Sequence, residues 1–172
     1  MTEAKEMVKK YGKEEASYEL SAKEHNDCVV RAVSHAFGVD YLDAHHFCEH
    51  KLHRVSGEGV YTQRYMPKVK QAFGKKLKQL GKVSKYGHFR KLTRPQKSKT
   101  EVYSHAKSKW VTKRVVNQVP YKVNEFLKAH SEGNYIITVK AHAFAIVNGV
   151  ILGNYSDDKR LTRKVNTAYK VS

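Results

Sequence analysis

The chain has 172 residues and 40% of them are hydrophobic, which excludes a disordered tail and is enough to bury the core of one domain. Thirty-three Lys and Arg oppose 16 Asp and Glu, and the formal net charge of +17 favours a polyanionic partner such as nucleic acid or an acidic protein. No apolar run can span a membrane, no apolar signal region is visible, and the two cysteines form no disulfide framework. We therefore expect one cytoplasmic domain over 1–172, which is not secreted and has no membrane partner.

The N-terminal part of the chain is expected to be helical. Residues 1–24 mix charges with a weak apolar periodicity, which indicates a helix or a mobile arm. Residues 26–38 (NDCVVRAVSHAFG) repeat apolar side chains at helical spacing. Asn26 or Asp27 can cap the first turn of this helix, and Gly38 can end it in the left-handed conformation.

Two further helices are expected before residue 75. Asp40 can cap a helix over 41–53. The next helix is expected to begin near Tyr61 or Pro67, because proline suits the first turn of a helix, and to end at Gly74.

A basic, polar and irregular insertion is expected over 75–119. The 42 residues between Glu58 and Glu101 contain no acidic residue and 13 Lys or Arg, with aromatic residues interleaved. This pattern is typical of a surface that binds a phosphate backbone, although a solvated face with core aromatics is the alternative. The valines of 101–119 favour some strand structure. The cations expected to bind a polyanion are Lys75, Lys76, Lys78, Lys82, Lys85, Arg90, Lys91, Arg94, Lys97 and Lys99.

The C-terminal part carries the clearest strand pattern. After a short amphipathic helix over 121–131, two apolar runs flank Asn148-Gly149, a dipeptide that favours the tight turn of a β-hairpin. A last strand is expected over 163–171. Helices first and an antiparallel sheet last indicate an α+β domain.

Cys28 occupies a chemically distinctive place in this pattern. It follows the expected cap, so it lies in the first turn of a helix, where free N–H groups and the helix dipole favour the nucleophilic thiolate. A nucleophile needs a base and the base needs an orienting partner. His142 lies on the first strand of the hairpin, and two polar residues, Asn154 and Asp157, follow the second strand.

The register of the hairpin bears on whether Asn154 or Asp157 orients His142. A two-residue turn at Asn148-Gly149 places His142 opposite Tyr155, so Asn154 points to the other face unless one extra residue bulges out. Gly153 suits such a bulge. Asn154 is therefore the first choice for the residue that orients His142, and Asp157 is the reserve.

Two segments of the chain resemble small papain-like cysteine peptidases found in phage and bacterial genomes. NDCVVRAVSHAFGVDY resembles their nucleophile helix, and VNEFLKAHSEGNYIITVKAHAFAIVNGVILGNY resembles their later half. The resemblance implies a papain-like fold, with N-terminal helices packed on a C-terminal antiparallel sheet. It further implies Cys28 as nucleophile, His142 as general base and acid, and Asn154 as orienter.

The resemblance also implies a reaction class and a setting. The reaction is attack on an amide, isopeptide or thioester carbonyl through an acyl-enzyme, on a protein substrate, in the host cytoplasm if the chain is phage-encoded. The glutamine that papain-like enzymes place before the cysteine is absent, since no Gln precedes Gln63. His25 and Asn26 are the candidates to donate to the oxyanion in its place, alongside the Cys28 backbone N–H.

Other interpretations remain open. Cys28 and His142 can be ordinary core residues, and the chain can be an inactive papain-like scaffold that binds DNA, RNA or an acidic host protein through its basic segment. His46, His50 and His53 share a helix face at spacings i, i+4 and i+7, but three ligands over two turns rarely converge on one ion. We therefore expect no metal and no cofactor.

Overall fold

The computed structural model describes residues 24–55, 57–60, 68–69, 77–80, 92–154 and 156–171, and the structural statements below refer to these residues. Apart from Glu24, the expected N-terminal segment 1–24 lies outside them. Of the third expected helix only Lys68 and Val69 are described, and both are helical. Within this part of the chain, no helix combines the length and apolar character needed to cross a bilayer.

The described residues form helices and two antiparallel sheets, which confirms the α+β class. The helices are α3 (Cys28–Phe37), α4 (Tyr41–Leu52) and α6 (Val123–Ala129). The larger sheet has the order β1-β7-β4-β5-β6, built from β1 (Leu77–Leu80), β7 (Thr167–Val171), β4 (Asn134–Val139), β5 (His142–Val147) and β6 (Val150–Leu152). The smaller sheet is a ribbon of two strands, β2 (Thr93–Ser104) and β3 (Lys109–Pro120), joined through the 3₁₀ turn His105–Lys107.

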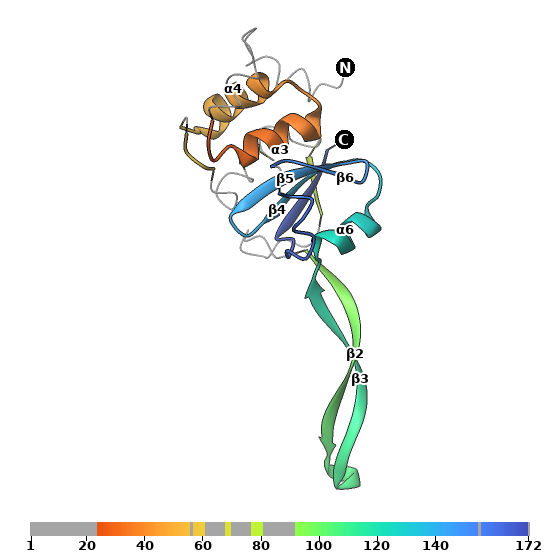
Figure 1. Cartoon of the computed structure of the whole chain (residues 1–172). Coiled ribbons are helices and arrows are strands. Elements are labelled where there is room, and N and C mark those ends of the chain that lie inside the picture. The colour runs from red at the N-terminus through yellow and green to blue at the C-terminus, as the bar shows by residue number, and fades with distance from the viewer. Residues whose placement is uncertain are drawn as a thin grey trace.

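Both faces of the larger sheet are covered. Ile136, Ala143 and Ala145 pack with α3 and α4, whereas Ile137 and Phe144 pack with α6 on the other face. Figure 1 shows α3 and α4 stacked above the sheet and α6 beside the base of the ribbon. Because neighbouring residues of a strand point to opposite faces, a sheet that is buried on both sides needs continuous apolar strands, which β4 and β5 provide.

Helix α3 lies along β5, and this packing sets the geometry of the site. The small side chains of Ala143 and Ala145 face the helix and allow it to approach the strand closely. At the far end of α3, the Asn134 side-chain amide donates to the Ala36 carbonyl at 3.0 Å, and Asn134 is paired with Val147 at the end of β5. The first residue of α3 therefore lies at the opposite end of β5, where the strand begins.

The local signals at the helix ends are mostly confirmed. Gly38 ends α3 with φ 60°, and Asp40 caps α4 by accepting from the Leu42 N–H at 3.0 Å. Asp27 is the N-cap residue of α3 by position, but its carboxylate makes no capping hydrogen bond. It instead accepts from the Tyr41 hydroxyl at 2.7 Å and pairs with Arg31 at 2.8 Å. The capping role expected for Asp27 is thus replaced by a tie between α3 and α4.

The expectation of irregular structure is wrong for the described residues of 75–100, whereas the strand structure favoured for 101–119 is confirmed. Leu77–Leu80 form strand β1 at the edge of the larger sheet, paired with β7, and 93–120 form the β2–β3 ribbon. Residues 81–91 lie outside the described part. Most of β2 escapes sequence analysis because neither face of the ribbon is buried, so its strands show no alternation of apolar and polar residues.

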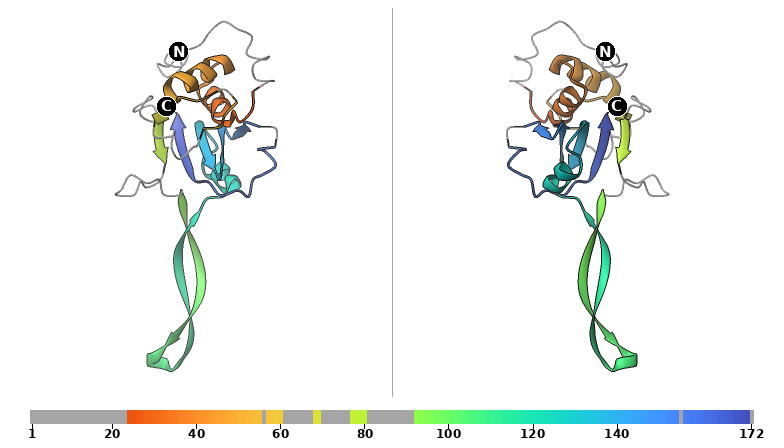
Figure 2. Two further views of the ribbon diagram at one scale, coloured as in Figure 1. Left: turned by 90° about the vertical axis from the view of Figure 1, so that its left-hand side faces the viewer. Right: turned by 90° about the vertical axis from the view of Figure 1, so that its right-hand side faces the viewer.

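The ribbon is joined to the domain by a short hydrogen-bonded base. Leu92 is buried and its carbonyl accepts from the Tyr121 N–H at 3.0 Å, closing the two strands. Arg94 forms an ion pair with Glu125 of α6, with Nε and a carboxylate oxygen 3.1 Å apart. Beyond this base, Figures 1 and 2 show the ribbon extending away from the domain.

We predict that the ribbon contributes little to the stability of the domain. Replacement of residues 97–116 by Asn-Gly joins Gln96 to Asn117, which are partners in the ladder, through a favoured turn. Since no side chain of 97–116 is buried, the Tm should change by less than about 2 °C in thermal unfolding followed by circular dichroism. Leu92→Ala, which removes a buried side chain at the base, should lower the Tm by roughly 5–15 °C. A similar large loss in the ribbon deletion would contradict the prediction.

Candidate active site

Cys28, His142 and Asp157 come together at one end of β5. Cys28 is the first residue of α3 and is half-buried, and His142 is the first residue of β5. The Cys28 thiol is close enough to the His142 ring to contribute to the raised pKa of that ring. The His142 Nε2 atom lies 2.8 Å from Asp157 Oδ1 and 3.0 Å from Oδ2. A sulfur, an imidazole and a carboxylate thus lie together.

The surroundings of His142 favour its protonated form. The hydrogen bond to Asp157 and then the neighbouring Cys28 thiol raise the pKa of His142 to about 9, and burial only partly opposes them. Its side chain is 16% exposed. At neutral pH the ring is therefore an imidazolium that lies next to the thiol and can be reached from solvent.

Asp157 is a buried anion with three hydrogen-bond donors. Its side chain is 3% exposed, and it accepts from His142, from the Arg163 guanidinium at 2.8 Å and from the Asn154 backbone N–H at 2.7 Å. Burial by itself raises the pKa of Asp157, but the hydrogen bonds from these three donors outweigh it and leave the pKa below its ordinary value. Arg163 also lies over the Phe144 ring, with 5.5 Å between its guanidinium carbon and the ring centroid, which fixes its position.

The structure corrects the choice of orienting residue. The expected hairpin register holds for Ala145 with Leu152 through Val147 with Val150, and Asn148 and Gly149 both have positive φ, as the Asn-Gly turn requires. However, β6 ends at Leu152, so pairing never reaches the residue opposite His142. The exposed Asn154 donates its backbone N–H to Asp157, and the Asp157 carboxylate is the group that contacts His142.

Gly153 is needed for close approach rather than for a bulge. A Cβ atom at this position would lie 2.5 Å from Asp157 Oδ2 and 2.8 Å from the Phe144 Cβ. The absence of a side chain lets Asp157 fold back across the end of β6 to reach His142. The sequence analysis therefore singled out Gly153 correctly, but the reason is the close approach of Asp157 and not a bulge.

A second buried carboxylate fixes the residues that precede Cys28. Glu24 accepts from Arg54 at 3.1 Å and from the Gly57 N–H at 2.6 Å, and it lies 2.7 Å from His45. Arg54 also donates to the His25 carbonyl at 3.2 Å. Burial raises the pKa of Glu24, but the hydrogen bonds from Arg54, His45 and Gly57 overcome it and lower the pKa to about 2. This network ties the entry to α3 to α4 and to the loop after it.

The candidates for oxyanion stabilisation lie within this entry segment. His25 is exposed, and its backbone N–H and carbonyl are bonded to Glu24 and Arg54. Asn26 has a left-handed φ of 54°, and its side-chain amide donates to the Gly57 carbonyl at 3.2 Å. The donor nearest the sulfur by covalent structure is the Cys28 backbone N–H, which belongs to the helix turn without intrahelical partners.

Cys48 provides an internal contrast to Cys28. It lies within α4, has 0% exposure, and packs in the core with Val33 and Phe47. Burial raises the pKa of Cys48 to about 12. A thiol in this setting is chemically inert.

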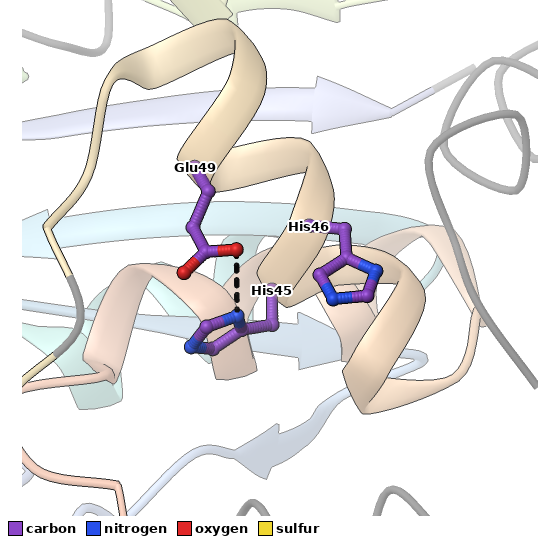
Figure 3. A group of neighbouring side chains, drawn as sticks. All are labelled: His45, His46 and Glu49. Atoms are coloured by element: carbon purple, nitrogen blue, oxygen red, sulfur yellow. Dashed lines mark ion pairs between the residues drawn. The ribbon is translucent and has the colours of Figure 1, made fainter. Parts of the chain in front are cut away.

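The histidines of α4 do not gather as the spacing suggested. His50 and His53 are exposed, and His53 ends the helix in the left-handed conformation with φ 52°. The residues that approach one another are instead His45, His46 and Glu49, with one ligand atom each within 4.8 Å of the others (Figure 3).

This trio has the right ligand types for a divalent cation but not a compact arrangement. The Nδ1 atoms of His45 and His46 are buried without a hydrogen-bond partner, and His45 Nδ1 lies 3.5 Å from a Glu49 oxygen. Ligands about 2.1 Å from one zinc ion lie roughly 3.4 Å apart, so these side chains would have to move closer. The Arg54 guanidinium, 3.1 Å from His45 Nε2, further disfavours a second cation here.

The cations expected to bind a polyanion are distributed over different elements. Lys97 and Lys99 are exposed on β2, and Lys78 is exposed on β1. Arg94 is partly exposed and forms an ion pair with Glu125. The remaining members of the set lie outside the described residues: Lys75, Lys76, Lys82, Lys85, Arg90 and Lys91.

Sequence reasoning missed two residues that position the site. Arg163 contacts Asp157, and Glu24 fixes the segment before Cys28. Arg163 is one of several cations in a polar stretch and Glu24 one of several acids near the N-terminus, so no local pattern separates them from surface charges. Searches against protein-family models, curated proteins and solved structures gave no match for the chain.

We predict that Gly153→Ala disrupts the His142–Asp157 hydrogen bond. The new methyl group would overlap the Asp157 carboxylate, so the pKa of His142 should fall from about 9 towards 6.5 in an NMR titration of its ring protons. Stability should fall by about 1–3 kcal/mol. Gly59→Ala is the matched control, because its Cβ would make only ordinary contacts, the nearest at 3.6 Å. An unchanged His142 pKa in Gly153→Ala would refute this account.

The raised pKa of His142 also predicts how stability depends on pH. A group with a folded-state pKa of about 9 and an ordinary value of 6.5 stabilises the fold fully below pH 6.5. This contribution is lost as pH rises through about 9. The difference in Tm between the native chain and His142→Gln should therefore be larger at pH 6 than at pH 9.5. A difference that is constant or grows with pH would exclude a raised His142 pKa.

Proposed function

We propose that the chain is a papain-like cysteine hydrolase or acyl-transfer enzyme that acts on an amide, isopeptide or thioester carbonyl. Cys28 is the nucleophile, His142 the general base and acid, and Asp157 the residue that orients His142. The observation that carries the proposal is the grouping of Cys28, His142 and Asp157, in which a helix-start thiol lies beside an imidazole that is hydrogen-bonded to a buried carboxylate. The chain order Cys, His, then an acidic or amide residue is that of papain-like enzymes.

The chemistry follows from this arrangement. The Cys28 thiolate attacks the carbonyl carbon, a C–S bond forms, and the π electrons move to the oxygen, where the Cys28 N–H can donate. When the intermediate collapses, the bond to the leaving group breaks and His142 gives the departing atom its proton. Water or an acceptor amine then attacks the thioester, transfers a proton to His142, and releases the thiolate as the C–S bond breaks.

Each partner suits its role. His142 is protonated at neutral pH, so it can stabilise a neighbouring thiolate and then act as the acid. The Asp157 carboxylate accepts a hydrogen bond from His142 Nε2, which holds the ring and leaves Nδ1 for proton exchange in the proposed mechanism. An ordinary core role explains Cys48 well, but it does not explain a half-buried Cys28 beside an imidazolium.

We predict that iodoacetamide alkylates Cys28 at least about ten-fold faster than Cys48 at pH 7. The reason is that Cys28 lies beside the His142 imidazolium, whereas Cys48 is buried and has its pKa raised to about 12. Peptide mass spectrometry measures both rates in one sample, and in urea the two rates should become similar. Equally slow alkylation of both cysteines in the folded chain would contradict the proposal.

The same assay separates the two orienting candidates. Asp157→Asn should slow alkylation of Cys28 at pH 6 by roughly ten-fold, because a neutral amide supports the imidazolium less well than a carboxylate. Asn154→Ala is the matched control, since Asn154 contributes its backbone N–H and should leave the rate nearly unchanged. Slower alkylation in Asn154→Ala than in Asp157→Asn would instead assign the orienting role to Asn154.

A further inference from the structure

The β2–β3 ribbon has no part in the proposed catalytic site. Each strand has 12 residues and, at about 3.4 Å per residue, the ribbon is roughly 40 Å long. Within the described residues its strands pair only with each other, and both views in Figure 2 show it extending from the domain. An isolated two-stranded ribbon is marginally stable in water. An arm of this length therefore indicates a role other than stabilising the fold.

The ribbon exposes apolar and aromatic side chains instead of burying them. None of the side chains of β2 or β3 is buried. Trp110 is 66% exposed, Val116 61% and Tyr103 41%. These side chains are available to a binding partner.

The exposed aromatic pair shares one face of the ribbon with three of the six cations of its strands. Ladder partners and every second residue of a strand share a face. The register pairs Lys97 with Val116, Lys99 with Arg114 and Tyr103 with Trp110, so these six residues lie on one face, here called the exposed face. All six are exposed, whereas the half-buried positions between Arg94 and Val119 fall on the other face.

The ribbon as a whole carries an excess of positive charge that favours an anionic partner. Residues 93–120 contain seven Lys or Arg and one acid, Glu101. Lys99 and Arg114 lie directly opposite each other, an arrangement that destabilises a free ribbon. Glu101 lies on the same face, opposite Thr112, and offsets this repulsion in part. A bound phosphate backbone would remove the repulsion.

The aromatic pair favours nucleic acid over an acidic protein. The Tyr103 and Trp110 rings pack edge to face, with centroids 5.7 Å apart, and the mostly exposed indole still offers a face to a ligand. Stacking on such rings needs an extended aromatic face, which bases provide and carboxylate side chains do not. In a duplex the base faces are already stacked on one another, so a single strand fits this surface better.

We propose that the exposed face binds single-stranded nucleic acid. Lys97, Lys99 and Arg114 contact phosphates, and Trp110 and Tyr103 stack on unpaired bases near the tip of the ribbon. This function is independent of the cysteine chemistry, so Cys28→Ala should bind as well as the native chain.

The single tryptophan of the chain is the reporter for the experiment. The full chain is titrated with a 20-nucleotide oligothymidylate while the fluorescence of Trp110 is recorded. We expect the emission to be quenched on binding, because the indole stacks on bases. Affinity should fall with salt, with a log–log slope of about −0.7 for each phosphate contacted.

A matched pair of triple variants separates the exposed face from bulk charge. Lys97→Ala with Lys99→Ala and Arg114→Ala should weaken binding by about ten-fold or more. The control is Lys128→Ala with Lys140→Ala and Lys164→Ala, which removes the same charge from exposed positions off the ribbon and should cost less than about two-fold. Trp110→Ser should weaken binding by about five- to one-hundred-fold when a labelled oligonucleotide is followed by anisotropy.

Three results would overturn the proposal. The first is equal weakening in the two triple variants, which would leave only bulk charge. The second is tighter binding of a 20-base-pair duplex without quenching of Trp110, which would indicate groove binding. The third is binding of polyglutamate with similar affinity and quenching, which would indicate an acidic protein as partner.

Discussion

The buried carboxylate of Asp157 is the interaction on which the candidate site depends. A charge that is almost fully removed from water is very costly unless it is paired and hydrogen-bonded. Its donors come from three places in the chain: β5 supplies His142, the turn after β6 supplies the Asn154 N–H, and the return segment supplies Arg163. These hydrogen bonds therefore hold all three segments around the Asp157 carboxylate. The position of the imidazole follows from these hydrogen bonds and not from the hairpin register alone.

Glu24 is a second buried carboxylate whose hydrogen bonds position residues of the site, here on the Cys28 side of the Cys28–His142 pair. This buried carboxylate is satisfied by Arg54, His45 and the Gly57 N–H, and it fixes the residues that lead into α3. One buried anion thus positions the base and another positions the approach to the nucleophile. Between them, the close packing of α3 on the alanines of β5 sets the distance from helix to strand.

The parts of the fold that the sequence predicts are those that local chemistry decides. The ends of α3 and α4, the Asn-Gly turn and the apolar strands all follow from neighbouring residues. The choice between Asn154 and Asp157 does not, because it depends on where β6 ends and on a close approach over Gly153. Most of strand β2 was not predicted, because a strand without a buried face shows no hydrophobic periodicity.

The ribbon and the candidate site are connected by one short segment of backbone. The Leu92 N–H at the base of the ribbon donates to the Asn166 carbonyl, and the Val165 N–H donates to the Tyr121 carbonyl. The same segment carries Arg163, whose side chain binds Asp157. The arm is therefore attached through paired backbone and not through a flexible linker, which would leave its orientation free. A strand bound on the exposed face would consequently be held in a defined direction relative to Cys28, since the hydrogen bonds that fix the arm and those that fix the base share this segment.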